Sequence, residues 1–150
     1  MKVTNRLFGI LVVALCFAAC SNDKIIDVNH DSYICFESDS ILISMADANQ
    51  VVLPVLVCAA PHTQKIDVDF EFAGKGLENE IDFTIDKPGS LDYPVGQYND
   101  TIKLNFLSPV IGVNEMDTIT IQLTSNSAGY LLGYPGPDHL HQQVRIFVTD

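Results

Sequence analysis

The chain has 150 residues, enough for one domain with a buried core, and its 8 basic and 19 acidic residues give a formal net charge of −11. This acidic balance argues against nucleic acid and against anionic membrane surfaces as partners, because both attract Lys and Arg. It suits a hydrated surface or the binding of cations.

The first twenty residues have the order of a secretory signal peptide. Lys2 and Arg6 flank the start of an apolar run from Leu7 to Leu15, and two alanines precede Cys20. Because a cysteine follows the small residues, the segment resembles a bacterial lipoprotein signal, which implies cleavage after residue 19 and acylation of Cys20. Two alternatives stay open: a plain secretory signal cleaved near Ala19, and an uncleaved anchor, for which the apolar run is short.

Residues 20–31 are mostly polar and show no sustained hydrophobic period, as expected of a tether between a lipid and a domain. Fully extended, residues 21–31 would reach roughly 35 Å at about 3.3 Å each. Without residues 1–19 the chain keeps six basic and nineteen acidic residues, a formal charge of −13. The sequence therefore predicts an exported domain that acyl chains hold at the bacterial outer membrane, at the cell surface.

Two cysteines remain beyond Cys20. Cys35 and Cys58 are expected on neighbouring strands, in a compartment where disulfides persist. A Cys35–Cys58 disulfide is one reading. The other is a pair of small thiols that are buried or half-buried.

From Tyr33 onward the apolar residues recur at every second position. In Lys65 to Phe72, the side chains of Ile66, Val68, Phe70 and Phe72 share one face of a strand, and charged side chains share the other. The same alternation recurs over residues 102–106, 118–124 and 144–148, whereas no stretch of eleven residues keeps a helical period. The pattern predicts an all-β domain over residues 32–150.

Two features indicate how the strands are arranged. Tyr33 to Phe36 and Ile41 to Met45 are interpreted as one first strand, broken where it changes sheet, and Pro54 places its strand at an edge or a bulge because proline cannot donate to a ladder. Seven or eight short strands between Gly- and Pro-rich turns are typical of a two-sheet Greek-key sandwich of the immunoglobulin-like class.

A family resemblance rests on motifs that follow one another in order. They are Val68 to Phe72, Gly74 to Glu80, Asp82-Phe83, Gly89 to Tyr93, Pro94-Val-Gly96, Asn114 to Asp117, Thr118 to Leu123 and Val144 to Asp150. In this order residues 65–150 resemble a Calx-beta-type domain. With the lipoprotein signal, the whole chain is similar to small surface lipoproteins of Bacteroidota, many of which are encoded near glycan-import systems.

The Calx-beta resemblance implies calcium as the one candidate cofactor. Calcium takes six to eight oxygen ligands, and the carboxylates that could converge are Glu37, Asp82, Glu115, Asp117 and Asp150. The family's aspartate run before the acidic turn is Pro109-Val110 here, and the run after the last strand is only Asp150. Because both runs are reduced, we expect solvated carboxylates without a metal or other cofactor, and calcium binding is the alternative.

Other candidate sites lie in loops and at strand starts. Tyr130 and Tyr134 could stack on a glycan, with core-capping tyrosines as the alternative. Asp-Ser-Ile and Asp-Thr-Ile sequences resemble the O-glycosylation signal of exported Bacteroidota proteins, which makes Ser40, Thr101 and Thr118 candidates. His139 and His141, two residues apart, offer too few ligands for a transition metal and are interpreted as a polar entry to the last strand.

Motifs of catalysis are missing from the sequence: it has no Gly-X-Ser-X-Gly, no His-Glu-X-X-His and no Cys-X-X-Cys. We therefore expect a non-catalytic, lipid-anchored surface protein with a binding or assembly role, accessory to glycan uptake. A structural subunit or spacer of a surface fibre is the alternative, and a calcium-binding module is a third hypothesis. The partners expected are the membrane and a protein or glycan, not nucleic acid.

Overall fold

The computed structural model describes residues 31–44, 49–107 and 117–149. The predicted signal peptide, Cys20, nearly all of the tether, Glu115 and Asp150 lie outside these ranges. The described residues form ten strands: β1 (Tyr33–Phe36), β2 (Ser40–Ser44), β3 (Gln50–Cys58), β4 (Ile66–Lys75), β5 (Phe83–Ile85), β6 (Ser90–Tyr93), β7 (Asn99–Phe106), β8 (Asp117–Asn126), β9 (Leu131–Leu132) and β10 (Gln143–Thr149).

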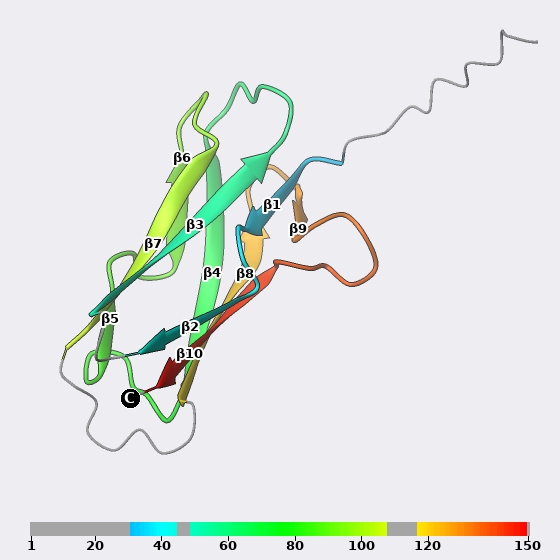
Figure 1. Ribbon diagram of the computed structural model, residues 1–150. Helices are drawn as coiled ribbons and strands as arrows, with labels where there is room; N and C mark the ends of the chain where they lie inside the picture. Colours follow the sequence, from blue (N-terminus) through cyan, green and yellow to red (C-terminus); the bar gives the residue numbers. More distant parts are fainter. Residues whose placement is uncertain (1–30, 45–48, 108–116, 150) are drawn as a thin grey trace, which may run out of the picture.

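The strands form two five-stranded sheets, ordered β5-β7-β3-β1-β9 and β2-β10-β8-β4-β6, which face each other as the two layers of a sandwich (Figure 1). This confirms the all-β, two-sheet prediction. The two strands in excess of the predicted number are accounted for by the very short β5 and β9. In the described part of the chain no helix is long and apolar enough to cross a membrane.

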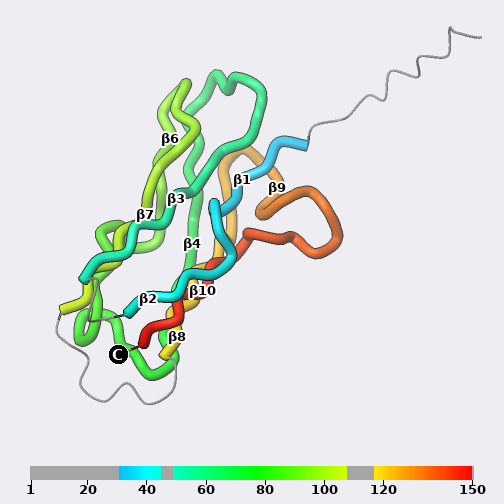
Figure 2. The backbone as a smooth tube through the Cα atoms, in the orientation of Figure 1, coloured from blue at the N-terminus to red at the C-terminus, as the bar shows by residue number. Residues whose placement is uncertain are grey.

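The predicted break in the first strand is where the chain changes sheet. β1 pairs with β3 in one sheet, and β2 pairs in parallel with β10 in the other. The connection runs through Glu37 to Asp39, and Figure 2 shows the chain crossing there from one layer to the other. Residues 33–44 therefore supply the edge strand of one sheet, β2, and the strand next to the edge of the other sheet, β1.

Pro54 lies in an interior strand rather than at a sheet edge. β3 is flanked by β7 on one side and β1 on the other. Val57 donates its N–H to Tyr98 on the β7 side, and because N–H groups alternate along a strand, the nitrogen of Pro54 faces the β1 side. β1 ends at Phe36, and the next residue, Glu37, still donates its N–H to the carbonyl of Pro54 at 3.2 Å, so the proline falls where the β1–β3 ladder ends.

The core between the sheets is built from the alternating apolar positions. In β4 the side chains of Ile66, Val68 and Phe70 are buried while Asp67 and Asp69 are exposed, as the alternation predicts. Each sheet contributes such a row to one continuous cluster of 22 buried residues. Burial of this apolar surface is the main stabilising contribution, at about 25 cal/mol per Å².

Candidate functional site

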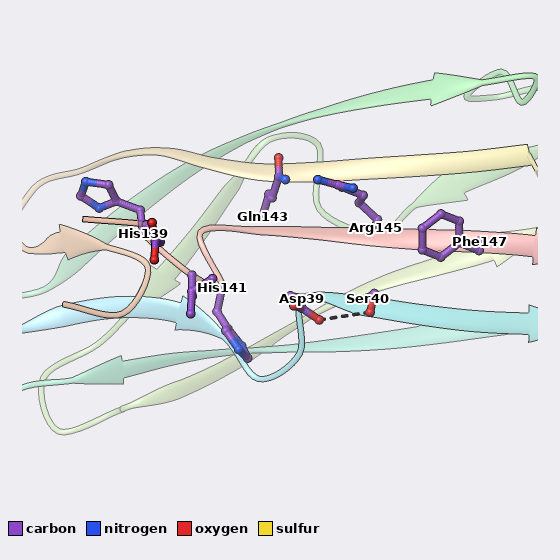
Figure 3. A pocket seen from close by; sticks show the side chains of 9 residues that line it. Asp39, Ser40, His139, His141, Gln143, Arg145 and Phe147 are labelled. Atoms are coloured by element: carbon purple, nitrogen blue, oxygen red, sulfur yellow. Dashed lines mark hydrogen bonds between the residues drawn. The ribbon is translucent and has the colours of Figure 1, made fainter. Parts of the chain in front are cut away.

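A pocket of about 340 Å³ opens where the loop before β10 meets the start of β2. In β10, Val144, Ile146 and Val148 are buried, so the side chains of the intervening residues point outward from the sheet. Figure 3 shows three of these outward side chains in a row along the strand, with Asp39 and Ser40 beside them. The lining consists of Asp39, Ser40, Asp138, His139, Leu140, His141, Gln143, Arg145 and Phe147.

Pairing between β2 and β10 brings the lining together. Ser40 lies directly opposite Arg145 in the parallel register, and the N–H of Arg145 donates to the carbonyl of Asp39 at 2.9 Å. The hydroxyl of Ser40 donates to the carboxylate of Asp39 at 3.1 Å. The pairing of β2 with β10 thus joins residues that are about a hundred positions apart in the chain.

His141 is held firmly in the wall of this pocket. Its backbone carbonyl accepts the N–H of Phe36 at 2.9 Å, and its Nδ1 lies 3.1 Å from the carbonyl of Phe36. Because a carbonyl only accepts, Nδ1 must carry the proton of that bond. The ring also stacks on Tyr134, with centroids 4.4 Å apart.

His139 does not pair with His141 as a ligand set. Both residues lie in the loop before β10 with positive φ, 43° and 62°, rather than within the strand. In Figure 3 the ring of His139 points away from the side chains of β10. Across residues 31–44, 49–107 and 117–149, no group of three or more His, Cys, Asp or Glu side chains is arranged to hold a metal ion.

The pocket offers both hydrogen-bond donors and acceptors. Arg145 and Gln143 supply donors, Asp39 and Asp138 supply acceptors, and Phe147 supplies a half-buried aromatic ring. Among the described residues Arg145 forms no ion pair, whereas Lys65 and Lys87 are paired with aspartates. Its guanidinium is therefore available to a ligand.

The two tyrosines proposed for glycan contact are not brought into one surface. Tyr134 is exposed and meets Tyr33 edge to face, with centroids 5.6 Å apart. Tyr130 packs against the core, and its backbone N–H and carbonyl both bond the Asn126 side chain. Tyr130 therefore matches the core-capping alternative, and Tyr134 remains available at the surface.

Cys35 and Cys58 are free thiols that lie near one another. Cys58 pairs with Tyr33, two positions from Cys35 on β1. Burial, followed by the neighbouring Cys58, raises the pKa of the Cys35 thiol to about 12. A hydrogen bond to Cys58 is the largest cause that raises the pKa of Tyr33 to about 12. Both cysteines are thiols in the structure, and the Cys35–Cys58 disulfide stays a prediction.

The carboxylates proposed for calcium do not all converge. Asp117 pairs with Val148 near the end of β10 and lies beside Gly76, and Asp82 accepts the N–H of Glu78, two residues from Gly76, at 2.8 Å. Glu37 instead donates its N–H to Pro54, which pairs with Thr101 on β7. Asp82 accepts the N–H of Leu107, which lies six positions along the chain from Thr101. At about 3.3 Å per residue this separation is roughly 20 Å. The predicted convergence is therefore wrong for Glu37.

The three candidate O-glycosylation residues all begin or lie within strands. Ser40 is exposed at the start of β2 and lines the pocket, whereas Thr101 on β7 and Thr118 on β8 are half-buried. Of the three hydroxyls, that of Ser40 is the most accessible. Modification of these positions stays a prediction.

No protein-family model matches the chain, and no curated protein matches its sequence. Solved structures share its fold at low sequence identity. The crystal structure of CBD12 from CALX1.2 aligns with a TM-score of 0.62 at 16% identity, and calcium binding domain CBD12 of CALX1.1 with 0.59 at 15%. The apo-form Calx CBD1 domain aligns with 0.58 at 17%.

The alignments cover 79%, 78% and 79% of this chain in that order. They cover 45% of the two CBD12 chains, so this chain spans less than half of their length, but 98% of the single CBD1 domain. At identities of 15–17% the likeness shows the fold alone. The residues described here thus form one Calx-beta-like sandwich.

Proposed function

We propose that this chain is a non-catalytic surface domain, held at the bacterial outer membrane by acyl chains on Cys20, that recognises a hydroxyl-rich ligand such as a glycan and is accessory to glycan uptake. The observation that supports the recognition role is the pocket between β2 and β10, where an unpaired Arg145 lies among carboxylates, an amide and an aromatic ring. The order of residues 1–20 supports the anchor.

The chemistry of the lining matches a sugar better than a purely anionic or apolar ligand. Sugar hydroxyls both donate and accept, and the pocket holds Asp39 and Asp138 as acceptors beside Arg145 and Gln143 as donors. A phosphate or a carboxylate would meet the repulsion of the two aspartates. The ring of Phe147 offers an apolar face to the carbon side of a sugar ring.

Arg145→Ala tests this proposal. We expect oligosaccharide binding to weaken at least roughly tenfold, since hydrogen bonds to a charged group contribute about 1.5–3 kcal/mol. Lys103→Ala is the matched control, because it removes one positive charge from an exposed position on the other sheet. Isothermal titration against neutral and uronic-acid oligosaccharides measures both variants. No binding by the unaltered chain, or equal binding by all three proteins, would contradict the proposal.

Calcium binding is a second candidate function. Two neighbours in fold are CBD12 structures, one of them a calcium binding domain. In this chain Asp82 and Asp117 contact positions only two residues apart, Glu78 and Gly76. Those two carboxylates would be the ligands from the described residues, with Glu115 and Asp150 as the further candidates in sequence.

Thermal unfolding distinguishes calcium binding from solvated carboxylates. A ligand of the folded state raises the melting temperature, with a stabilisation of about 2.7 kcal/mol at a hundred times its dissociation constant. We expect calcium to raise the melting temperature, EDTA to reverse the rise, and Asp117→Asn to abolish it. An unchanged melting temperature in calcium and in EDTA would remove this candidate.

A further inference from the structure

The edge strand β2 differs from the other sheet edges. β5, β9 and β6 are edges of three, two and four residues, and β6 carries the exposed Asp92. β2 has five residues, none of them charged and none a proline. An apolar, uncharged edge presents backbone groups to any strand that can pair with it, and proteins usually protect such edges with charges or proline.

The backbone of β2 shows which groups face that edge. The carbonyl of Asp39 accepts from Arg145, and the carbonyl of Ile43 accepts from the Thr149 hydroxyl, so both point toward β10. Because N–H and C=O directions alternate along a strand, the N–H and C=O of Leu42 point the opposite way, to the open edge. Leu42 is also the most exposed large hydrophobic residue described, at 69%.

The sequence of β2 is its own mirror image: Ser-Ile-Leu-Ile-Ser over residues 40–44. If two copies of this strand pair antiparallel about Leu42, Leu42 meets Leu42, Ile41 meets Ile43, and Ser40 meets Ser44 of the second copy. A two-fold contact requires this kind of self-complementarity, because the same surface serves both partners.

Charge also favours a second copy as the partner at this edge. A chain with a net charge of −11 repels itself over most of its surface, but β2 and its neighbour β10 carry one charge between them, that of Arg145. The outward ring of Phe147 lies opposite Leu42 in the β2–β10 register. Pairing would therefore gather two leucines and two phenylalanines on one face.

We propose that two copies of this chain associate through their β2 strands, antiparallel and centred on Leu42, to join their β2-containing sheets into one continuous sheet. Such a contact is closed, since each copy has one β2 edge, and it gives a dimer rather than a growing fibre. The inference does not depend on the ligand of the pocket. Loss of ligand binding in Arg145→Ala and loss of dimers in the Leu42 variants are measured independently, so one can fail without the other.

Cysteine cross-linking of the full chain in membranes tests both the contact and its register. A hydrogen-bonded antiparallel pair has Cα atoms about 5.5 Å apart, within the range that a disulfide spans. We expect mild oxidation to link Leu42→Cys chains into dimers well above the level of the unaltered chain. Ser40→Cys is the matched control on the same strand. Its copies would lie roughly 13 Å apart in this register and would stay unlinked.

Leu42→Lys gives an independent readout, because it places two positive charges at the symmetry axis while the exposed position tolerates the substitution. We expect the detergent-extracted unaltered chain to have the mass of a dimer by light scattering, and the Leu42→Lys variant to have the mass of a monomer. Val52→Lys, at an exposed position of β3 on the other sheet, should remain a dimer. Equal cross-linking at positions 40 and 42, or a monomeric unaltered chain, would overturn the proposal.

Discussion

The imidazole of His62 is the most informative polar side chain in the described core. It is buried, with Nδ1 2.8 Å from the carbonyl of Gln64 and Nε2 2.9 Å from the carbonyl of Gln97. Both contacts are to backbone carbonyl oxygens, which accept hydrogen bonds and do not donate. Tyr98 meets the ring edge to face at 5.1 Å. The histidine thereby joins the β3–β4 turn to the β6–β7 turn.

His62→Ala should lower the free energy of unfolding by about 2–4 kcal/mol, because it removes two hydrogen bonds and leaves two carbonyls without their partner. Thr63→Ala, at the exposed neighbouring position, should change it by less than about 0.5 kcal/mol. Urea unfolding of both variants measures the difference. Equal stability of the two would show that the ring does not support the fold.

Burial of Cys35 predicts a loss of stability at alkaline pH. Burial raises the pKa of the folded thiol to about 12, from an ordinary value of 9.0 that the unfolded chain regains. Between these values the unfolded chain releases the proton and the folded chain keeps it. The free energy of unfolding therefore falls as pH rises, by about 1.4 kcal/mol per pH unit from this group.

Cys35→Ala should make this alkaline slope shallower, although it lowers stability at neutral pH by leaving a cavity. Chemical unfolding at about pH 8 and about pH 10 measures the slope in each protein. Burial also raises the pKa of Tyr93, so part of the slope should persist in the variant. Parallel pH profiles of the variant and the unaltered chain would contradict the assignment to Cys35.

The candidate pocket could be predicted from the sequence only in part. From the sequence, Tyr134, His139 and His141 are candidates because they lie close together in the chain. Arg145 follows only from the alternation over residues 144–148, and Asp39 only as the first residue of the Asp-Ser-Ile signal. Their meeting depends on the β2–β10 pairing, a contact between distant segments that periodicity does not encode.

At the scale of the strands, the alternation of apolar and polar residues predicts a strand correctly where one of its faces packs in the core and the other faces water. β4 and β8 follow the predicted rows of apolar residues. β9 could not be predicted, because a strand of two residues is too short to show a period. Pro54 is tolerated in an interior strand for a topological reason: its nitrogen faces the residue just past the end of β1, where the β1–β3 ladder stops, which only the sheet order reveals.

The loop between β9 and β10 depends on Gly133, which has φ +83°. Its N–H donates to Ile34 at 2.8 Å, and a Cβ there would lie 2.6 Å from the carbonyl oxygen of His139. Gly133→Ala therefore combines left-handed strain, roughly 1–2 kcal/mol, with a backbone clash.

Gly129→Ala is the matched control, because its φ is +70° but nothing lies within 4 Å of the added Cβ. We expect Gly133→Ala to destabilise the domain by at least about 1 kcal/mol more than the control and to weaken ligand binding in the pocket. Thermal unfolding and titration measure the two effects. Identical stability and binding of the two variants would contradict the importance of the tight contact between Gly133 and the carbonyl of His139.

At the scale of the whole molecule, the start of β1 and the end of β10 lie at opposite ends of the sandwich. The chain enters β1 at one end of the sandwich, while β10 finishes at the other, beside the start of β8 (Figure 1). A lipid on Cys20 would thus hold the domain by the end that β1 enters. The polar tether gives the domain reach without fixing its orientation.

The anchor is the claim on which the proposed location and role depend, and it is tested most directly by mass spectrometry of the N-terminal peptide from the native protein extracted from membranes. We predict that this peptide begins at Cys20 and carries the added mass of two or three acyl chains. A native chain with an unmodified Cys20, or one that still carries residues 1–19, would contradict the account.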